Sequence, residues 1–265
     1  MITPLHNSGV LSARFALQRS QGELDNVFKR LSTGKRINSG KDDPAGLIAA
    51  ERLAMELKAL EAESRALSRQ DANANITDGH MSQLSSMMSE LNGLVVASAN
   101  TAGMSDAEIQ ANQMQIDSLA SSIQRFTGDA VKSLDGVDLP DGGNAEVAAL
   151  LNGASAAVAS LVSGGSNSLA SGNFEAAQAA IKGAISDMAT ARGTVGAYQK
   201  NTIGPRLNAN QVAFENLAES KSRILDADFA VETSNLSRLK ILTTSGMKVL
   251  KIAQQQSERV LGLLS

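Results

Sequence analysis

Residues 53–95 read LAMELKALEAESRALSRQDANANITDGHMSQLSSMMSELNGLV, and this stretch decides the fold. Every seventh position in it is apolar, and no proline interrupts the pattern. The series is Leu53, Leu60, Leu67, Ala74, Met81, Met88 and Val95. Asp43 can cap a helix here, and Pro44 suits the first helical position. The pattern predicts one helix of about 55 residues, roughly 80 Å long, that ends at residues 100–103. A break near Asp78-Gly79 is the alternative.

Both ends of the chain carry narrower apolar lines with the same spacing. Near the N-terminus the line is Val10, Leu17, Leu24 and Leu31, and Ala13, Ser20 and Val27 run beside it. Near the C-terminus the two lines are Leu236, Thr243, Leu250, Ser257, Leu264 and Leu239, Gly246, Ala253, Val260. Isolated helices with such narrow stripes are marginal in water. We therefore expect the two ends to pair, and to fold stably only when neighbouring molecules cover their remaining apolar faces.

The middle of the chain is less regular. A third helix is predicted from Ser105 or Asp106 to about Phe126, and a fourth from about Asn173, interrupted at Gly204-Pro205. Residues 127–175 contain turn signals that suggest a small hairpin, followed by a short helix over 145–162. The predicted fold is mainly α: a long antiparallel helical rod with paired, coiled-coil-like terminal helices and a small irregular or hairpin region in the centre.

Composition excludes several classes of function. Aromatic residues make up 3% of the chain, and there is no Trp or Cys, so no thiolate metal site or Cys nucleophile exists. The net charge of -3 does not indicate the basic surface that binds nucleic acid. The longest apolar run, residues 147–151, is too short for membrane insertion. The first ten residues lack the order of a cleavable signal peptide.

No group of residues forms a convincing catalytic, cofactor or metal site. His6 and His80 lie far apart in sequence and are interpreted as solvated. The stretch GKRINSGKDD at 34–43 follows a helix and lacks the Ser or Thr of a phosphate-binding loop. Asp226 and Asp228 are more typical of a helix cap than of a catalytic pair. Met81, Met87 and Met88 have helical spacing, which indicates core packing. No enzyme activity and no cofactor are therefore expected.

Two long stretches resemble the signatures of bacterial flagellins. Residues 30–53, RLSTGKRINSGKDDPAGLIAAERL, resemble the N-terminal signature, and 73–76 and 94–100 continue the match. Residues 222–242, SRILDADFAVETSNLSRLKIL, and the closing VLGLLS resemble the C-terminal signature. The signature residues are Arg30, Asn38, Asp42, Asp43, Ala45, Gly46, Asp226, Asp228 and Asn235. The central segment is short, so the chain resembles a flagellin without the outer variable domains.

The resemblance implies a structural subunit that polymerises into the flagellar filament for motility. Residues 1–40 and 226–265 would form an inner terminal-helix domain, and 41–225 an outer helical rod domain with a short insert at about 127–175. The polymerisation seam would be Val10, Leu17, Leu24, Val27, Leu31, Leu236, Leu239, Leu250, Val260 and Leu264. The chain would be exported unfolded by the flagellar type III apparatus without signal cleavage. Its partners would be itself, an export chaperone, the filament cap and hook–filament junction proteins, in a thin extracellular filament.

One further implication and three alternatives complete the sequence reading. In the family, an Arg in the patch that the innate-immune receptor binds aligns with Glu90, beside Leu94, so we expect weak recognition by that receptor.

The first alternative to a filament subunit is a hook–filament junction protein. The second is a cytoplasmic coiled-coil scaffold, with ends that are folded in the free subunit. The third is an enzyme within residues 127–175.

Overall fold

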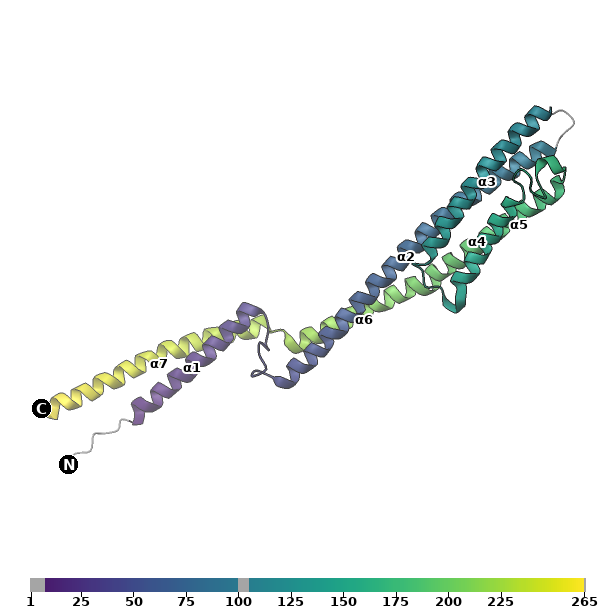
Figure 1. Cartoon of the computed structure of the whole chain (residues 1–265). Helices are drawn as coiled ribbons and strands as arrows, with labels where there is room; N and C mark the ends of the chain where they lie inside the picture. The colour runs from purple at the N-terminus through teal and green to yellow at the C-terminus, as the bar shows by residue number, and fades with distance from the viewer. Residues whose placement is uncertain (1–7, 100–104, 265) are drawn as a thin grey trace. The chain divides into compact units, whose positions relative to one another are not determined.

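The computed structural model describes residues 8–99 and 105–264, with side chains from residue 10 to residue 255 within those ranges. The helices in order are α1 (Ser8–Thr33), α2 (Pro44–Ala99), α3 (Asp106–Leu134), η2 (Pro140–Gly142), α4 (Gly143–Ala159), η3 (Leu169–Ser171), α5 (Phe174–Tyr198), η4 (Gln199–Ile203), α6 (Gly204–Leu225) and α7 (Phe229–Leu264) (Figure 1). The chain divides into two compact units. The first joins Met1–Ala59 to Phe214–Ser265, and the second is Leu60–Ala213. The mainly α prediction is confirmed, because the described residues contain long helices packed in pairs and no strand.

Helix α2 is continuous from Pro44 to Ala99, so the alternative of a break near Asp78-Gly79 is wrong. Within the second unit, the seven-residue line of α2 is buried from Leu67 to Val95, and Leu84 and Leu91 lie in the same core. Asp78 is held by Arg192 of α5, whose Nε and Nη2 donate to the two carboxylate oxygens at 2.8 and 3.2 Å. Asp78, where the sequence allowed a break in α2, is therefore bonded to α5.

The core of the second unit is built from aliphatic side chains rather than aromatic ones. Helices α3, α4 and α5 each contribute one buried line to it. The fully buried large side chains are Met81, Leu84, Met88, Leu91, Ile116, Ile123, Leu134, Leu151, Leu161, Ile181, Met188 and Ile203. Met81 and Met88 are core residues, as predicted, and Met87 packs against the core from its edge. His80 is half-buried rather than solvated, with its ring 6.4 Å from that of Phe126. His6 lies outside the described residues.

The prediction of turns and a hairpin directly after Phe126 is wrong. Helix α3 continues to Leu134, because Thr127, Ala130 and Leu134 extend its buried line. Gly128 is exposed, so the helix tolerates it there. The rest of the 127–175 segment forms α4, the short helices η2 and η3, and turns. Asp117 fastens this segment to α3 by accepting a hydrogen bond from the Ser163 backbone nitrogen at 2.9 Å.

The predicted interruption at Gly204-Pro205 is confirmed as a π-helical turn, Gln199–Ile203, between α5 and α6. Pro205 has no backbone N–H and its ring crowds the preceding turn, which explains why the regular α-helical pattern fails here. The Gln199 side chain donates to Asp71 Oδ1 at 3.0 Å and to Asn75 Oδ1 at 3.1 Å, both on α2. The irregular turn is thus fixed against the long helix.

Three predicted helix starts are confirmed by their capping bonds. Asp43 accepts from the Gly46 backbone nitrogen at 2.9 Å, and Ser105 forms a reciprocal capping box with Glu108. Asp228 accepts from the Ala230 nitrogen at 2.8 Å, which makes it the N-terminal cap of α7. The predicted end of α2 at residues 100–103 lies outside the described residues.

We predict that Gly136→Ala destabilises the second unit. A Cβ at Gly136 would overlap the Asn73 side-chain amide, which donates to the Gly136 carbonyl at 3.1 Å. Because Asn73 must then turn away, the expected loss in the free energy of unfolding is about 1 kcal/mol, measured in urea. Gly128→Ala is the control. Its Cβ would meet nothing within 4 Å, so it should stabilise helix α3. Equal stability of the two variants would contradict this account.

Candidate functional site

The candidate functional site lies in the first compact unit, where α1 and α7 run antiparallel, side by side (Figure 1). Gly246 of α7 faces Leu17 of α1, and a Cβ at Gly246 would lie 3.3 Å from Leu17 Cδ1. Closer to the other end of the pair, Arg30 Nη1 of α1 donates to Glu232 Oε1 of α7 at 3.2 Å. The two sequence-distant apolar lines therefore meet, which confirms the predicted pairing of the chain ends.

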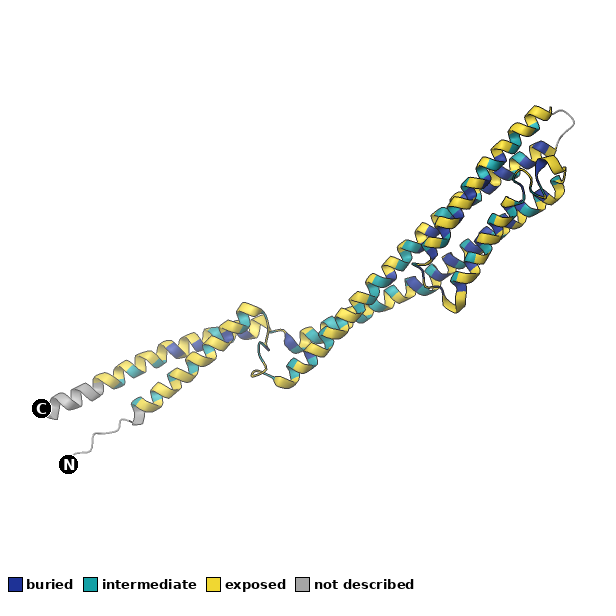
Figure 2. Ribbon diagram, viewed as in Figure 1, coloured by how far each residue is buried: buried dark blue, intermediate teal, exposed yellow. Residues whose placement is uncertain are grey.

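This seam is only partly covered (Figure 2). Of the predicted seam residues, Val27 and Leu239 are buried. The remaining seam side chains that the structure describes are half-buried: Val10, Leu17, Leu24, Leu31, Leu236 and Leu250. The side chains of Val260 and Leu264 lie outside the described residues. The second unit buries its apolar line on α2 from Leu67 to Val95, whereas the terminal pair leaves much of its own line in contact with water.

Large apolar side chains also project from the outer faces of α1 and α7. They are Leu11, Phe15, Phe28, Phe229, Val231, Ile241, Leu242, Met247, Val249 and Ile252. One of them, Phe28, lies beneath Lys240, with the ammonium 5.7 Å from the ring centroid. Single exposed apolar residues are ordinary, but ten large ones on two paired helices are typical of a surface that another protein covers.

The terminal helices connect to the rest of their unit through a tied junction, defined here as residues 34–43 and 225–228. Gly34 has a φ of 68°, a left-handed conformation that lets α1 end and the chain turn. Backbone bonds then join the two connections: the Arg36 nitrogen donates to Leu225 O at 2.6 Å, and the Ala227 nitrogen to Gly34 O at 2.9 Å. Ile37, Ala50 and Leu225 form a small buried cluster beside these bonds.

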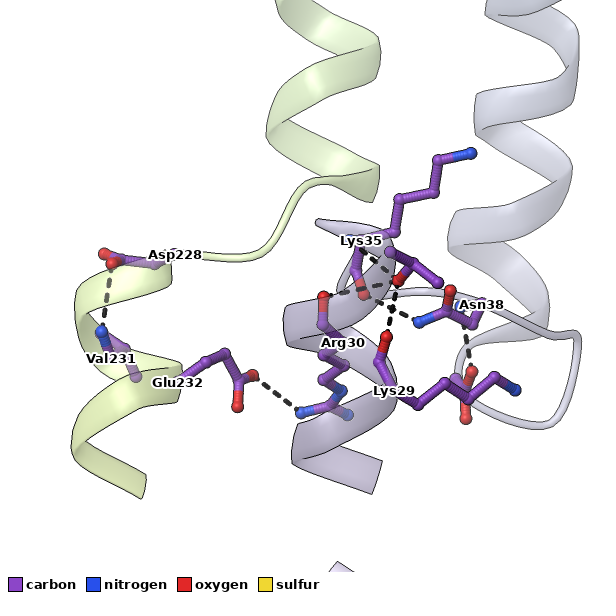
Figure 3. Close-up of polar contacts among 9 residues, drawn as sticks. Lys29, Arg30, Lys35, Asn38, Asp228, Val231 and Glu232 are labelled. Atoms are coloured by element: carbon purple, nitrogen blue, oxygen red, sulfur yellow. Dashed lines mark hydrogen bonds and ion pairs between the residues drawn. The ribbon is translucent and has the colours of Figure 1, made fainter. Parts of the chain in front are cut away.

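Polar side chains hold the first connection in shape (Figure 3). Asp42 Oδ2 accepts from the backbone nitrogens of Asn38 and Ser39 at 3.0 and 2.9 Å. The Asn38 side chain donates to Lys35 O at 2.8 Å, and the Thr33 hydroxyl donates to Lys29 O at 2.9 Å. The hydrogen bond from the Asn38 nitrogen is the main reason why the pKa of Asp42 is lowered, and the Ser39 hydroxyl adds to it.

The other signature residues lie around this junction. Asp226 accepts from the Ser222 hydroxyl at 2.6 Å, and Asn235 lies beside Glu232 in a cavity between α1 and α7. Ala45 is exposed. Gly46 leaves no space for a side chain, since a Cβ there would lie 2.5 Å from Asp43 Oδ2 and 2.7 Å from Ile37 Cδ1.

The structure separates the two residues of the expected receptor patch from this site. Both lie on α2 in the second unit, where Glu90 is exposed and Leu94 packs partly against the core. Sequence reasoning missed Glu232, which is 6% exposed and pairs with Arg30. An antiparallel alignment of the two apolar lines, with Leu17 opposite Gly246, would have placed Glu232 near Arg30.

Within residues 8–99 and 105–264, no group of three or more His, Asp or Glu side chains could hold a metal ion. None of the described helices combines the length and apolar content that a membrane crossing requires.

We predict that acid loosens the junction through Asp42. Because folding lowers its pKa, the stabilisation is present above the unfolded value of about 3.9 and is lost as the pH falls through the folded value. Amide hydrogen exchange at Asn38 and Ser39 should therefore accelerate, relative to the intrinsic rate, below about pH 4. Asp42→Asn should show weak protection at every pH, and Asp25→Asn, on the exposed face of α1, should behave like the wild type. Protection unaffected by Asp42→Asn would contradict the assignment.

Comparisons with known proteins match both ends of the chain. The model of the bacterial flagellin N-terminal helical region matches residues 5–138, and the model of the bacterial flagellin C-terminal helical region matches residues 178–264. The flagellar filament 30.7 kDa core protein of Treponema maltophilum is 26% identical over 98% of this chain and 99% of its own length. The flagellin of Bacillus subtilis strain 168 is 26% identical, with 98% of each chain covered.

A larger relative shares only part of its length. The phase 2 flagellin of Salmonella abortus-equi is 33% identical over 122 residues, which are 46% of this chain and 24% of that protein. The two matched helical regions contain α1 and α7, the paired helices described above, and the first two relatives match over nearly the full chain. The chain belongs to the bacterial flagellin family, whose members are structural subunits of the extracellular flagellar filament.

Proposed function

We propose that this subunit polymerises through α1 and α7, and that lattice neighbours complete the seam these helices leave half-covered. The observation that carries the proposal is the contrast in burial between the two compact units. Leu84 and Leu91 of α2 are fully buried inside the subunit, whereas Leu17 and Leu24 of α1 are only half-buried. At about 25 cal/mol per Å², covering that remaining surface would strongly favour assembly.

The apolar outer faces of α1 and α7 support the same mechanism. Ile241 and Ile252 expose 66% and 56% of their surface in the single chain. Contacts between different faces of identical subunits build an open helical polymer when the rotation between subunits does not close into a ring. We propose residues 1–40 and 226–265 as the inner domain of this polymer and residues 41–225 as its outer domain. The tied junction lies where the two would meet.

We further propose a structural rather than catalytic role, and export of the unfolded chain by the flagellar type III apparatus without removal of a signal peptide. The absence of cysteine from the sequence suits export in unfolded form, because stray disulfides would hinder it. An export chaperone would cover the apolar faces of α7 before export. The filament cap and the hook–filament junction proteins would be the partners during assembly.

We predict that the terminal helices are the least stable part of the dilute subunit. Brief protease treatment below the polymerisation threshold should remove residues 1–40 and 226–265 and leave residues 60–213 intact, as read by mass spectrometry. The trimmed protein should not add to filament seeds, because it lacks the proposed seam. The same treatment of preformed filaments should leave the ends protected. Trimmed subunits that still extend seeds would overturn the proposed function.

We also predict weak activation of the innate flagellin receptor by the monomer. Glu90 places a negative charge on the exposed face of α2, where the family pattern has Arg. Glu90→Arg should therefore raise the response in a receptor-reporter cell assay. Glu56→Arg, an equal charge change on an exposed position of the same helix, should not. A full response from the unmodified protein would contradict this prediction.

A further inference from the structure

A polar cavity of about 200 Å³ opens between the terminal helices beside the Arg30–Glu232 ion pair. Its polar lining comes from both helices in equal number: Glu23, Asn26 and Arg30 of α1, and Glu232, Asn235 and Arg238 of α7. The buried side chains of Val27 and Leu239 line it as well. Among the residues that the structure describes, this ion pair is the only one that joins α1 to α7.

Glu232 is only half satisfied in this position. Its Oε1 accepts from Arg30 Nη1, whereas its Oε2 is buried without a hydrogen-bond partner among the described residues. Figure 3 draws a bond from Arg30 to one Glu232 oxygen and none to the other. A buried carboxylate oxygen without a donor costs free energy, unless water or another group enters. In the separate subunit the cavity has room for water. In an assembled lattice that closes over the cavity, a donor from the neighbour can replace that water.

The lining restricts the chemistry of that donor. The two carboxylates and the two guanidinium groups cancel in formal charge. An incoming Lys, Arg or carboxylate would gain no net Coulomb attraction from this balanced lining, and it would lose its hydration on entering. A side-chain amide is neutral, and it offers both an N–H₂ donor for Glu232 Oε2 and a carbonyl acceptor for a guanidinium.

We propose that the cavity receives a glutamine side chain from a terminal helix of a second copy of this chain, and that this contact sets the register between subunits. The candidates with described, exposed side chains are Gln18, Gln21, Gln254 and Gln255. The second copy is favoured over other partners because Phe229 and Val231, which come just before Glu232 in α7, are exposed in the single chain and offer apolar surface to a neighbour. The inference rests on the proposed function, and it adds a specific polar contact to the apolar seam. A single buried polar contact in an apolar seam is a known way to fix register.

The first test removes the Glu232 carboxylate, which is the proposed acceptor, and keeps a side chain of similar size. Glu232→Met should raise the critical concentration for seeded growth about tenfold or more, as expected for the loss of one hydrogen bond to a charged group. The helix content of the subunit should be unchanged, because the Arg30 side chain, which loses its partner, is 36% exposed and can be hydrated. Glu219→Met is the matched control, since its carboxylate is exposed and pairs only with Arg223 of its own helix.

The second test locates the incoming side chain, and it uses the absence of native cysteine. Chains with Asn235→Cys are mixed with chains that carry one cysteine at Gln18, Gln21, Gln254 or Gln255, in an excess of wild-type subunits that forms the lattice. After oxidation, we expect a disulfide-linked dimer with one of the four, in filaments and not in dilute monomer. Gln124→Cys, on an exposed position of α3, is the control.

The outcomes separate the two proposals. Wild-type subunits that fail to polymerise would overturn the proposed function itself. Wild-type growth combined with an unchanged critical concentration for Glu232→Met, or with no cross-link at any of the four glutamines, would overturn only the inference about the cavity. A cross-link at the control position equal to those at the glutamines would also overturn it.

Discussion

The close approach of Leu17 to Gly246 is the contact on which the terminal pair depends. Because Gly246 has no side chain, Leu17 can pack close to the backbone of α7; a Cβ at 246 would already lie 3.3 Å from Leu17 Cδ1. This match fixes how α1 and α7 are aligned. The alignment in turn places Arg30 beside Glu232 and opens the polar cavity next to them.

The two compact units use the same seven-residue pattern in different ways. In the second unit, α3, α4 and α5 complete the environment of the apolar line on α2, and polar ties such as Arg192–Asp78 fix the alignment of the helices. In the described part of the first unit, α1 and α7 pack chiefly against each other. A helix pair of this kind is marginal alone. One pattern thus gives a self-sufficient core in one unit and an incomplete surface in the other.

Much of the fold follows from sequence, since periodicity and capping are local properties. The seven-residue line of α2, the caps at Asp43, Ser105 and Asp228, and the interruption before Pro205 all depend on residues within a few turns of one another. The end of α3 was predicted wrongly because Gly128 is a turn signal that packing overrides. Thr127, Ala130 and Leu134 face the core, and their burial outweighs the weak helix propensity of one glycine.

The candidate site shows a different limit of prediction. Its apolar members were visible as spaced lines, but Glu232 was not, because a charged residue becomes a seam residue only when its partner is known. Ile37, Ala50 and Leu225 form their cluster across a large distance in sequence. No local pattern marks such a group. The family signature pointed to the right segments without explaining why Gly46 and Asp42 belong to them, and the junction geometry supplies that reason.

The tied junction has a mechanical consequence. A rotating filament carries tension and torque, and within the first unit any pull on α1 and α7 passes through two covalent connections that lie beside each other. The bonds from Arg36 to Leu225 and from Ala227 to Gly34 couple these connections, so that neither can lengthen alone. The load is therefore divided between the two connections. The longer connection, around Asp42, cannot extend first and leave the shorter connection to carry the whole force.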